Sequence, residues 1–191
     1  MLGRIVARSV LGHCLRQPAG DVQLILDHLG KPTVAGRSET PIHFNISHSG
    51  DHVLFALARE RRVGVDVEHI REIKDLNEIA ARYFSKIDYL RLLTVPERVR
   101  TESFYRCWTM KEAYLKARGE GFKLPMDSFD VAFLPGEMPR LLETRFDHVD
   151  ARRWCFYELD LGSFYLAALA TESAPELELK LWDWNGWQVN G

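Results

Sequence analysis

Two acidic residues, Asp66 and Glu68, lie in the stretch VGVDVE at residues 63–68. Side chains of a strand alternate between its two faces, so the valines would share one face and both carboxylates the other, about 7 Å apart. Gly64 adds no side chain to the carboxylate face. A face open to water would need no further explanation, but two like charges in a partly enclosed site require a cation nearby.

A second group of charges lies in the segment FYRCWTMKEAYLKARG at residues 104–119, which has the pattern of a helix. Its apolar stripe is formed by Phe104, Cys107, Trp108 and Leu115, with Lys111 near the middle and Glu112 at the edge. In one interpretation Lys111 extends to solvent and Glu112 pairs with Lys116. In the other, Glu112 joins Asp66 and Glu68 around a hard cation such as Mg²⁺, and the lysines neutralise a phosphate substrate. The spacing alone does not select between them.

Two shorter stretches add polar groups. FNISHSG at residues 44–50 places Ser47, His48 and Ser49 at the end of a strand. Because neighbouring residues of a strand point to opposite faces, contact with an anion suits them better than a nucleophile paired with its base. LGKPT places Lys31 beside Pro32, and no P-loop, dinucleotide or zinc signature occurs in the chain.

Patterns along the chain predict the elements that position these groups. Residues 2–15 form a helix, and strands follow at 41–49, 52–60 and 63–70. Helices cover residues 73–118, with Ser85 as a cap, Pro96 opening the last helix, and Gly119 and Gly121 ending it. Further strands are predicted at 128–134, 153–160, 163–172 and 176–184. Each half therefore reads as a helix followed by strands, and HVLFALARE is echoed by FYLAALATE 112 residues later (164 − 52).

Composition sets the broad class. The chain has 191 residues, of which 46% are hydrophobic and 27% charged, as expected for a globular protein with a real core. A net charge of -2 and a pI near 6.4 give no bulk electrostatic reason to expect binding to nucleic acid or to an anionic membrane. Three scattered cysteines, no apolar run of transmembrane length and no signal peptide predict reduced thiols and a cytoplasmic protein.

Read jointly, GKP, FNISHSG, VGVDVE and FYRCWTMKEAYLKARGEGFKLPMDSF resemble the Sfp-like 4′-phosphopantetheinyl transferases. The most specific part is the G-x-D-x-E strand followed by W-[ST]-x-K-E-[AS]-x-x-K, with Asp66 and Glu112 separated by 46 residues (112 − 66). The resemblance implies an α+β fold of two similar halves, 1–68 and 69–191, related by a pseudo-twofold. Each half would be a helix packed on a mainly antiparallel sheet, with coenzyme A between the halves.

The resemblance also implies an activity. Members of this family transfer the phosphopantetheine arm of coenzyme A to a serine of an acyl or peptidyl carrier protein and release adenosine 3′,5′-bisphosphate. These carriers belong to fatty acid, polyketide and nonribosomal peptide biosynthesis, and the sequence leaves the pathway open.

The implied roles fall on matching positions. Asp66, Glu68 and Glu112 would hold Mg²⁺ against the pyrophosphate, and Lys116 and Lys111 would serve the phosphate charge. Ser47 and His48 would contact phosphates, and Lys31 with Pro32 would line the adenine end. The base that takes the serine proton would be either Glu112 or a water on the metal, and both remain open.

Three expectations concern the surroundings of the site. Relatives carry a basic N-terminal segment ahead of the helix that matches residues 2–11, so the resemblance predicts a shortened first half and altered 3′-phosphate binding. The carrier protein is expected to dock near Arg71, Lys74 and the apolar positions of residues 76–84. A fold of two pseudo-symmetric halves favours a monomer.

Two other functions remain as alternatives. A non-catalytic module could bind coenzyme A or a carrier protein without transfer, although such a module has no need of three converging carboxylates. A metal-dependent phosphohydrolase could use the same site and would release bisphosphate from coenzyme A without any carrier protein.

Overall fold

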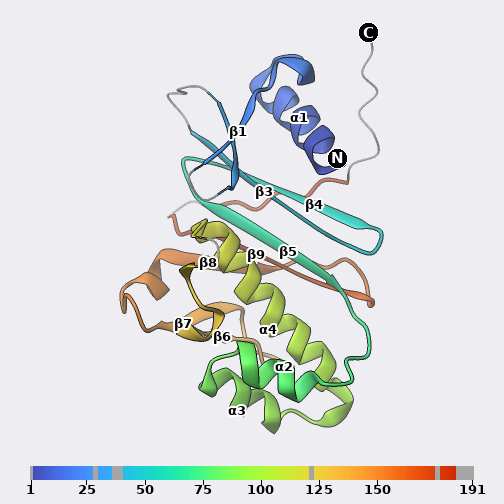
Figure 1. The fold of residues 1–191 in the computed structure, drawn as a ribbon, viewed down its shortest axis with the longest axis vertical. Helices are drawn as coiled ribbons and strands as arrows, with labels where there is room; N and C mark the ends of the chain where they lie inside the picture. The colour runs from blue at the N-terminus through green and yellow to red at the C-terminus, as the bar shows by residue number, and fades with distance from the viewer. Residues whose placement is uncertain (1, 28–29, 36–40, 121–122, 175–176, 184–191) are drawn as a thin grey trace.

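The computed structural model describes residues 2–27, 30–35, 41–120, 123–174 and 177–183 of the chain. The α-helices are α1 (Leu2–Leu15), α2 (Leu76–Tyr83), α3 (Lys86–Thr94) and α4 (Glu97–Arg118). The strands are β1 (Leu24–Leu26), β2 (Pro32–Val34), β3 (Ile42–Ser49), β4 (His52–Arg59), β5 (Val63–His69), β6 (Phe129–Ala132), β7 (Arg140–Thr144), β8 (Trp154–Glu158) and β9 (Tyr165–Glu172). Short 3-10 helices are η1 (Ala19–Asp21), η3 (Met126–Ser128) and η4 (Asp150–Arg153). Figure 1 shows α1 at one end of the long axis and α2 with α3 at the other.

All strand pairs among the described residues are antiparallel. β1 pairs with β2, β3 with β4 and β6 with β7, while β9 lies between β5 and β8 in a three-stranded sheet. Asp66 of β5 is opposite Ala168 of β9, so distant parts of the chain meet at the acidic strand. The predicted α+β class, with helices on small antiparallel sheets, is confirmed.

The predicted boundary between two halves at residue 68 falls inside β5, and β5 pairs with β9 of the predicted second half. The repeated sequence segments are both strands, β4 and β9. The division into 1–68 and 69–191 stays a prediction.

Helix α1 covers the hairpin of β3 and β4. Ala7 and Leu11 of α1 pack with Val22 and with Phe44 of β3, in a small core separate from that of α4. The predicted helix at residues 2–15 and the predicted hairpin are therefore confirmed.

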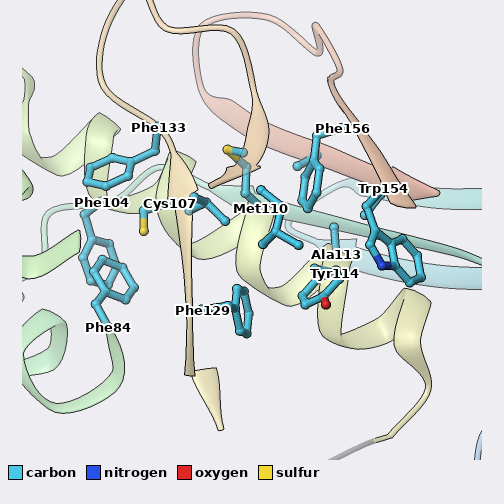
Figure 2. Packing of buried hydrophobic residues seen from close by; sticks show 14 of the residues in the cluster. Phe84, Phe104, Cys107, Met110, Ala113, Tyr114, Phe129, Phe133, Trp154 and Phe156 are labelled. Carbon is cyan, nitrogen blue, oxygen red and sulfur yellow. The ribbon is translucent and has the colours of Figure 1, made fainter. Parts of the chain in front are cut away.

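Helix α4 packs across β5 and β9 (Figure 1). Figure 2 shows side chains of α4 in one cluster with aromatic residues from later in the chain. The labelled residues of α4 are Phe104, Cys107, Met110, Ala113 and Tyr114, and the later ones are Phe129, Phe133, Trp154 and Phe156. The helix begins after Pro96 and ends at Gly119, whose φ of 69° lies in the left-handed region that glycine adopts readily. Both ends were predicted, although Gly121 lies outside the described residues.

The other helices also follow their sequence signals. Ser85 caps α3 as predicted, because its hydroxyl accepts a hydrogen bond from the backbone N–H of Asp88 at 3.0 Å. The strand predicted at 176–184 is wrong for residues 177–183, which form no regular element, and residues 176 and 184 lie outside the described part. None of the helices in the described ranges is long and apolar enough to cross a membrane.

Candidate active site

A pocket of about 360 Å³ opens where β3, β5 and α4 meet. Its walls are formed by Ile46, Ser47, His48, Asp66, Glu68, Trp108, Glu112 and Lys116. Six of the residues predicted to form the site therefore lie in one cavity, although they come from three separate elements.

Gly64 is the reason that α4 can lie so close to the acidic strand. A Cβ atom at this position would be 2.1 Å from the carbonyl oxygen of Ala113 and 2.3 Å from the backbone nitrogen of Ala117. Residues 64, 66 and 68 share one face of β5. The close approach at Gly64 therefore also brings Asp66 and Glu68 near the preceding turns of α4. Glu112 and Lys116, one turn apart, then meet the two strand carboxylates at the pocket.

Asp66 is the most enclosed of the three acids, at 3% exposure. Its Oδ1 accepts hydrogen bonds from Ser47 Oγ at 2.9 Å and from Lys116 Nζ at 2.5 Å. Lys116 Nζ also donates to Ser47 Oγ at 3.1 Å. One oxygen of Asp66 is therefore held by a lysine and a serine from two different elements.

Burial raises the pKa of each acid in the pocket above its ordinary value. For Asp66 the Lys116 ammonium opposes this rise, whereas for Glu68 the neighbouring Asp66 charge adds to it. Burial likewise raises the pKa of Glu112, and the charges of Asp66 and Glu68 raise it further against the opposing Lys116. Burial is the largest cause of all three shifts, and only for Glu68 and Glu112 do neighbouring carboxylates add to it, so a further cation would favour the charged forms.

The donor set suits a hard divalent cation such as Mg²⁺, which prefers carboxylate oxygens. Asp66 Oδ2 is buried and has no hydrogen-bond partner among the described residues, so this oxygen is available to an ion. Within the described ranges, no group of three or more acidic, histidine or cysteine side chains already has the arrangement of a metal site. The residues fit the ion by their chemistry, and the side chains would have to adjust to hold it.

The prediction that Lys111 contacts phosphate is wrong. Its side chain is fully buried and turned away from the pocket, and its Nζ lies 2.7 Å from Asp88 Oδ2. The same ammonium donates to the carbonyl oxygens of Met126 at 3.0 Å and Phe129 at 2.5 Å. Because a buried ammonium needs such partners, Lys111 joins α4 to α3 and β6 and does not reach the pocket.

The other interpretation of the helix charges, in which Lys111 extends to solvent and Glu112 pairs with Lys116, is not borne out either. Lys111 does not extend to solvent, and Lys116 contacts Asp66 rather than Glu112.

Lys31 and Pro32 lie outside the pocket lining. The ammonium of Lys31 donates to the carbonyl oxygen of Lys116 at 2.6 Å, so it reaches the C-terminal end of α4. Pro32 begins β2 and is exposed. The structure thus brings Lys31 near the residue that contacts Asp66 and leaves Pro32 on the surface.

Ser47 and His48 separate as strand neighbours must. Ser47 is buried and faces Asp66, whereas His48 is exposed at the rim of the pocket. The surface expected to meet a carrier protein needs a correction, because four of the six apolar side chains of residues 76–84 lie in the core or pack against it: Leu76, Ile79, Ala80 and Phe84. Arg71, Lys74 and Tyr83 are exposed there.

Sequence reasoning missed one contributor and gave another a different contact. Trp108 was assigned to an apolar stripe, yet it lines the pocket and stacks on Phe104 with the ring centroids 5.8 Å apart. Ser49 was expected to contact an anion together with Ser47 and His48, yet its hydroxyl donates to Glu68 Oε2 at 3.1 Å. The alternation of polar residues at 45, 47 and 49 was the available signal for Ser49.

Comparison with known proteins identifies the family. A model of the 4′-phosphopantetheinyl transferase superfamily matches residues 62–170, and a model of the N-terminal part of 4′-phosphopantetheinyl transferases matches residues 1–60.

Two curated relatives match most of the chain. The 4′-phosphopantetheinyl transferase HetI of Nostoc sp. is 36% identical over 169 residues, which cover 88% of this chain and 68% of the relative. The 4′-phosphopantetheinyl transferase Sfp of Bacillus subtilis is 37% identical over 179 residues, covering 92% and 75%. A solved structure of holo-[acyl-carrier-protein] synthase from Thermotoga maritima covers 58% of this chain and 61% of its own, with 20% identity and a TM-score of 0.44. On the family models and the two relatives, the chain belongs to the 4′-phosphopantetheinyl transferase superfamily.

Proposed function

We propose that this protein transfers the 4′-phosphopantetheine group of coenzyme A to a serine hydroxyl of an acyl or peptidyl carrier protein and releases adenosine 3′,5′-bisphosphate. Membership of the family supports the reaction. The observation that carries its assignment to a site is the pocket in which Asp66, Glu68 and Glu112 meet beside Lys116. Mg²⁺ is proposed as the ion that the three carboxylates hold.

The reaction is a displacement at phosphorus. The serine oxygen attacks the phosphorus atom that carries the pantetheine arm, and the bond from that atom to the bridging pyrophosphate oxygen breaks. When bound, Mg²⁺ supplies positive charge that offsets the charge on the pyrophosphate oxygens. Glu112 is proposed to take the serine proton, because its carboxylate lines the same cavity as the other two acids and would be within reach of an incoming hydroxyl.

The remaining pocket residues are proposed to serve the phosphates. Lys116 is the cation in contact with the acidic group, and its ammonium is placed to neutralise charge on the departing bisphosphate. His48 offers an imidazole at the same cavity, and the Ser47 hydroxyl would donate to a phosphate only by giving up its bond to Asp66. Lys31 and Pro32 are proposed to mark the adenine end, which the link from Lys31 to the end of α4 supports.

The carrier protein is proposed to approach past Arg71 and Lys74, which are exposed just beyond β5. An acidic partner surface would complement these two cations. We further propose that the enzyme works as a monomer in the cytoplasm, without nucleic acid or membrane. The three free cysteines agree with a reducing compartment.

The direct test is mass spectrometry of an apo carrier protein incubated with coenzyme A and Mg²⁺. The wild-type chain should add a phosphopantetheine mass to the carrier. Asp66→Ala and Glu112→Ala should each slow the transfer by roughly 10²-fold or more, since they remove a proposed ligand and the proposed base. Glu143→Ala, which removes an exposed carboxylate on β7, should transfer at the wild-type rate.

Each other result has a definite meaning. Undiminished transfer by Asp66→Ala would remove that residue from the proposed metal site. Carrier binding without any mass gain at saturating coenzyme A would favour a non-catalytic module. Release of bisphosphate without carrier protein would favour a phosphohydrolase.

A further inference from the structure

Strand β3 contacts the acidic strand β5 through side chains, although the two strands belong to different sheets. Three residues that alternate along β3 each accept a hydrogen bond from a backbone N–H group of β5. The pairs are Asn45 Oδ1 with Val65 N at 2.9 Å, Ser47 Oγ with Val67 N at 3.4 Å, and Ser49 Oγ with His69 N at 3.0 Å. This seam satisfies donors that β5 would otherwise leave unpaired.

The two serines of the seam make a second bond that the asparagine does not. Ser47 Oγ donates to Asp66 Oδ1 and Ser49 Oγ to Glu68 Oε2, at 2.9 Å and 3.1 Å. A hydroxyl carries a single proton, so the bond accepted from the backbone leaves that proton for the carboxylate. Each serine of β3 therefore fixes a carboxylate of β5 relative to the backbone of β5.

The third position of the seam shows the same spacing without a carboxylate. Asn45 accepts from Val65, and the residue before Val65 is Gly64, which has no side chain to hold. The repeat thus pairs each acid of β5 with a hydroxyl of β3 and pairs the glycine with an amide.

We infer that Ser49 is a positioning residue for Glu68, fixing the orientation in which this proposed ligand is presented to the divalent cation. The inference rests on the proposed function. Glu68 is only half-buried and has several rotatable bonds, so without Ser49 its carboxylate would have to be ordered when the ion binds. With Oε2 held by the hydroxyl, Oε1 is left for the ion. Hydrogen-bond partners of ligands typically change metal affinity by about 10-fold to 100-fold.

Ser49 gives a cleaner test than Ser47. The hydroxyl of Ser47 also contacts Lys116, so a change there would disturb an ammonium and a carboxylate together. Asn45 supplies the matched control, because it makes the same kind of bond to β5 from the same face of β3 and touches neither acid. A purely structural seam would make the Asn45 and Ser49 variants behave alike.

The experiment measures Mn²⁺ binding to the full chain by electron paramagnetic resonance, with coenzyme A present and no carrier protein. Ser49→Ala should raise the dissociation constant for Mn²⁺ about tenfold or more. Ser49→Thr, which keeps the hydroxyl, should restore it to near the wild-type value. Asn45→Ala should leave it unchanged, even where urea unfolding shows that Asn45→Ala and Ser49→Ala lose similar stability.

Equal Mn²⁺ affinity in Ser49→Ala and Asn45→Ala would overturn the inference while leaving the transferase proposal intact. If wild type transferred phosphopantetheine but bound no Mn²⁺, the metal assignment would fail and the role of Ser49 with it. Should Ser49→Ala not fold, Ser49→Cys tests the same contact with nearly the same shape, because a thiol is only a weak donor and acceptor. Wild-type affinity in the cysteine variant would equally count against Ser49.

Discussion

Lys111 and Lys116 lie on one helix, and the structure gives them opposite environments. Lys116 is partly exposed at the pocket, where its ammonium meets Asp66. Lys111 is fully buried, and its ammonium is shared between Asp88 and two backbone carbonyl groups. A buried charge is tolerated only while its partners remain. Replacing Lys111 should therefore lower stability, whereas replacing Lys116 should lower transfer.

Lys111→Met should lower the free energy of unfolding by about 3–5 kcal/mol, since it removes the nearer cation of the buried Asp88 carboxylate and leaves it only the Arg91 guanidinium, 3.8 Å from Oδ1, among the described residues. Lys116→Met should change stability by much less, because its pair is partly open to solvent, and should instead reduce transfer. Urea unfolding and steady-state transfer assays separate the two effects. A folded, stable Lys111→Met protein with a raised KM for coenzyme A would restore the phosphate role and contradict the structural one.

This contrast marks the limit of sequence reasoning at single residues. Helical spacing correctly puts Lys111 on the same side as Phe104 and Cys107, but it does not tell which layer that side meets. Helix α4 packs against the strands below and against α3 and β6 beside it, so an inward-facing lysine had two possible destinations. The bond from Ser49 to Glu68 was not predicted for a related reason, since it depends on the register of β3 against β5.

At the scale of elements, the approach of α4 to β5 decides whether the pocket exists. Sequence suggested that the glycine beside Asp66 leaves the acidic face bare, and the structure shows that the backbone of α4 fills the bared space. Helix backbone cannot rotate away as a side chain can. A methyl group at this position would therefore have to displace the whole helix relative to the strand.

Gly64→Ala should destabilise the protein by about 3 kcal/mol or more, at the upper end for overpacked cores, because the added Cβ would meet backbone atoms of Ala113 and Ala117. Transfer should fall as well, even under conditions where the variant is folded, because Glu112 and Lys116 would move away from β5. Gly20→Ala is the matched control, since a Cβ there meets nothing within 4 Å. Unfolding curves and transfer rates of the two variants give the comparison, and similar results for both would contradict the close approach.

Elements with strong local signals were predictable. The helices have a cap at Ser85, a proline at 96 and a glycine at 119, and strands β3, β4, β5 and β9 have clear apolar patterns. The segment 176–184 has an equally clear alternation, yet its described residues form no strand. Alternation reports which side chains could be buried, whereas a strand also needs a neighbouring edge to pair with. The short strand β7 was missed because its sequence, RLLET, has no such pattern.

At the scale of the molecule, the pocket lies where two packed units meet. One unit is α1 on the β3–β4 hairpin, and the other is α4 with the sheet β5–β9–β8 and the strands beside it. Between β3 and β5 the contact is made by polar side chains, so the junction combines structural hydrogen bonds with the acids of the pocket. On its other face β5 packs Val63, Val65 and Val67 with Ala56 of β4, so the two units also share an apolar core behind the polar junction.

The far side of α4 is anchored by a different polar cluster, centred on Asp150 of η4. Its carboxylate accepts hydrogen bonds from the Tyr114 hydroxyl and, at 2.7 Å, from Arg118, and Arg153 lies 3.9 Å away. Burial alone would raise the pKa of Asp150, but the bonds from Tyr114 and Arg118 outweigh it and hold the pKa below its ordinary value. The cluster thus joins α4 to the loop before β8 by a carboxylate that is charged in the folded protein.

Because the pKa of Asp150 is lower in the folded than in the unfolded chain, its contribution to stability is present above the unfolded pKa of about 3.9 and is lost as pH falls through the folded value. Asp150→Asn should therefore lower the free energy of unfolding by about 2 kcal/mol at neutral pH, and the difference from wild type should shrink on acidification below about pH 4. Urea unfolding between neutral pH and pH 3 measures it. Asp160→Asn removes the same charge from an exposed loop and controls for net charge. A gap between Asp150→Asn and wild type that stayed constant across this range would show that the carboxylate charge does not anchor α4.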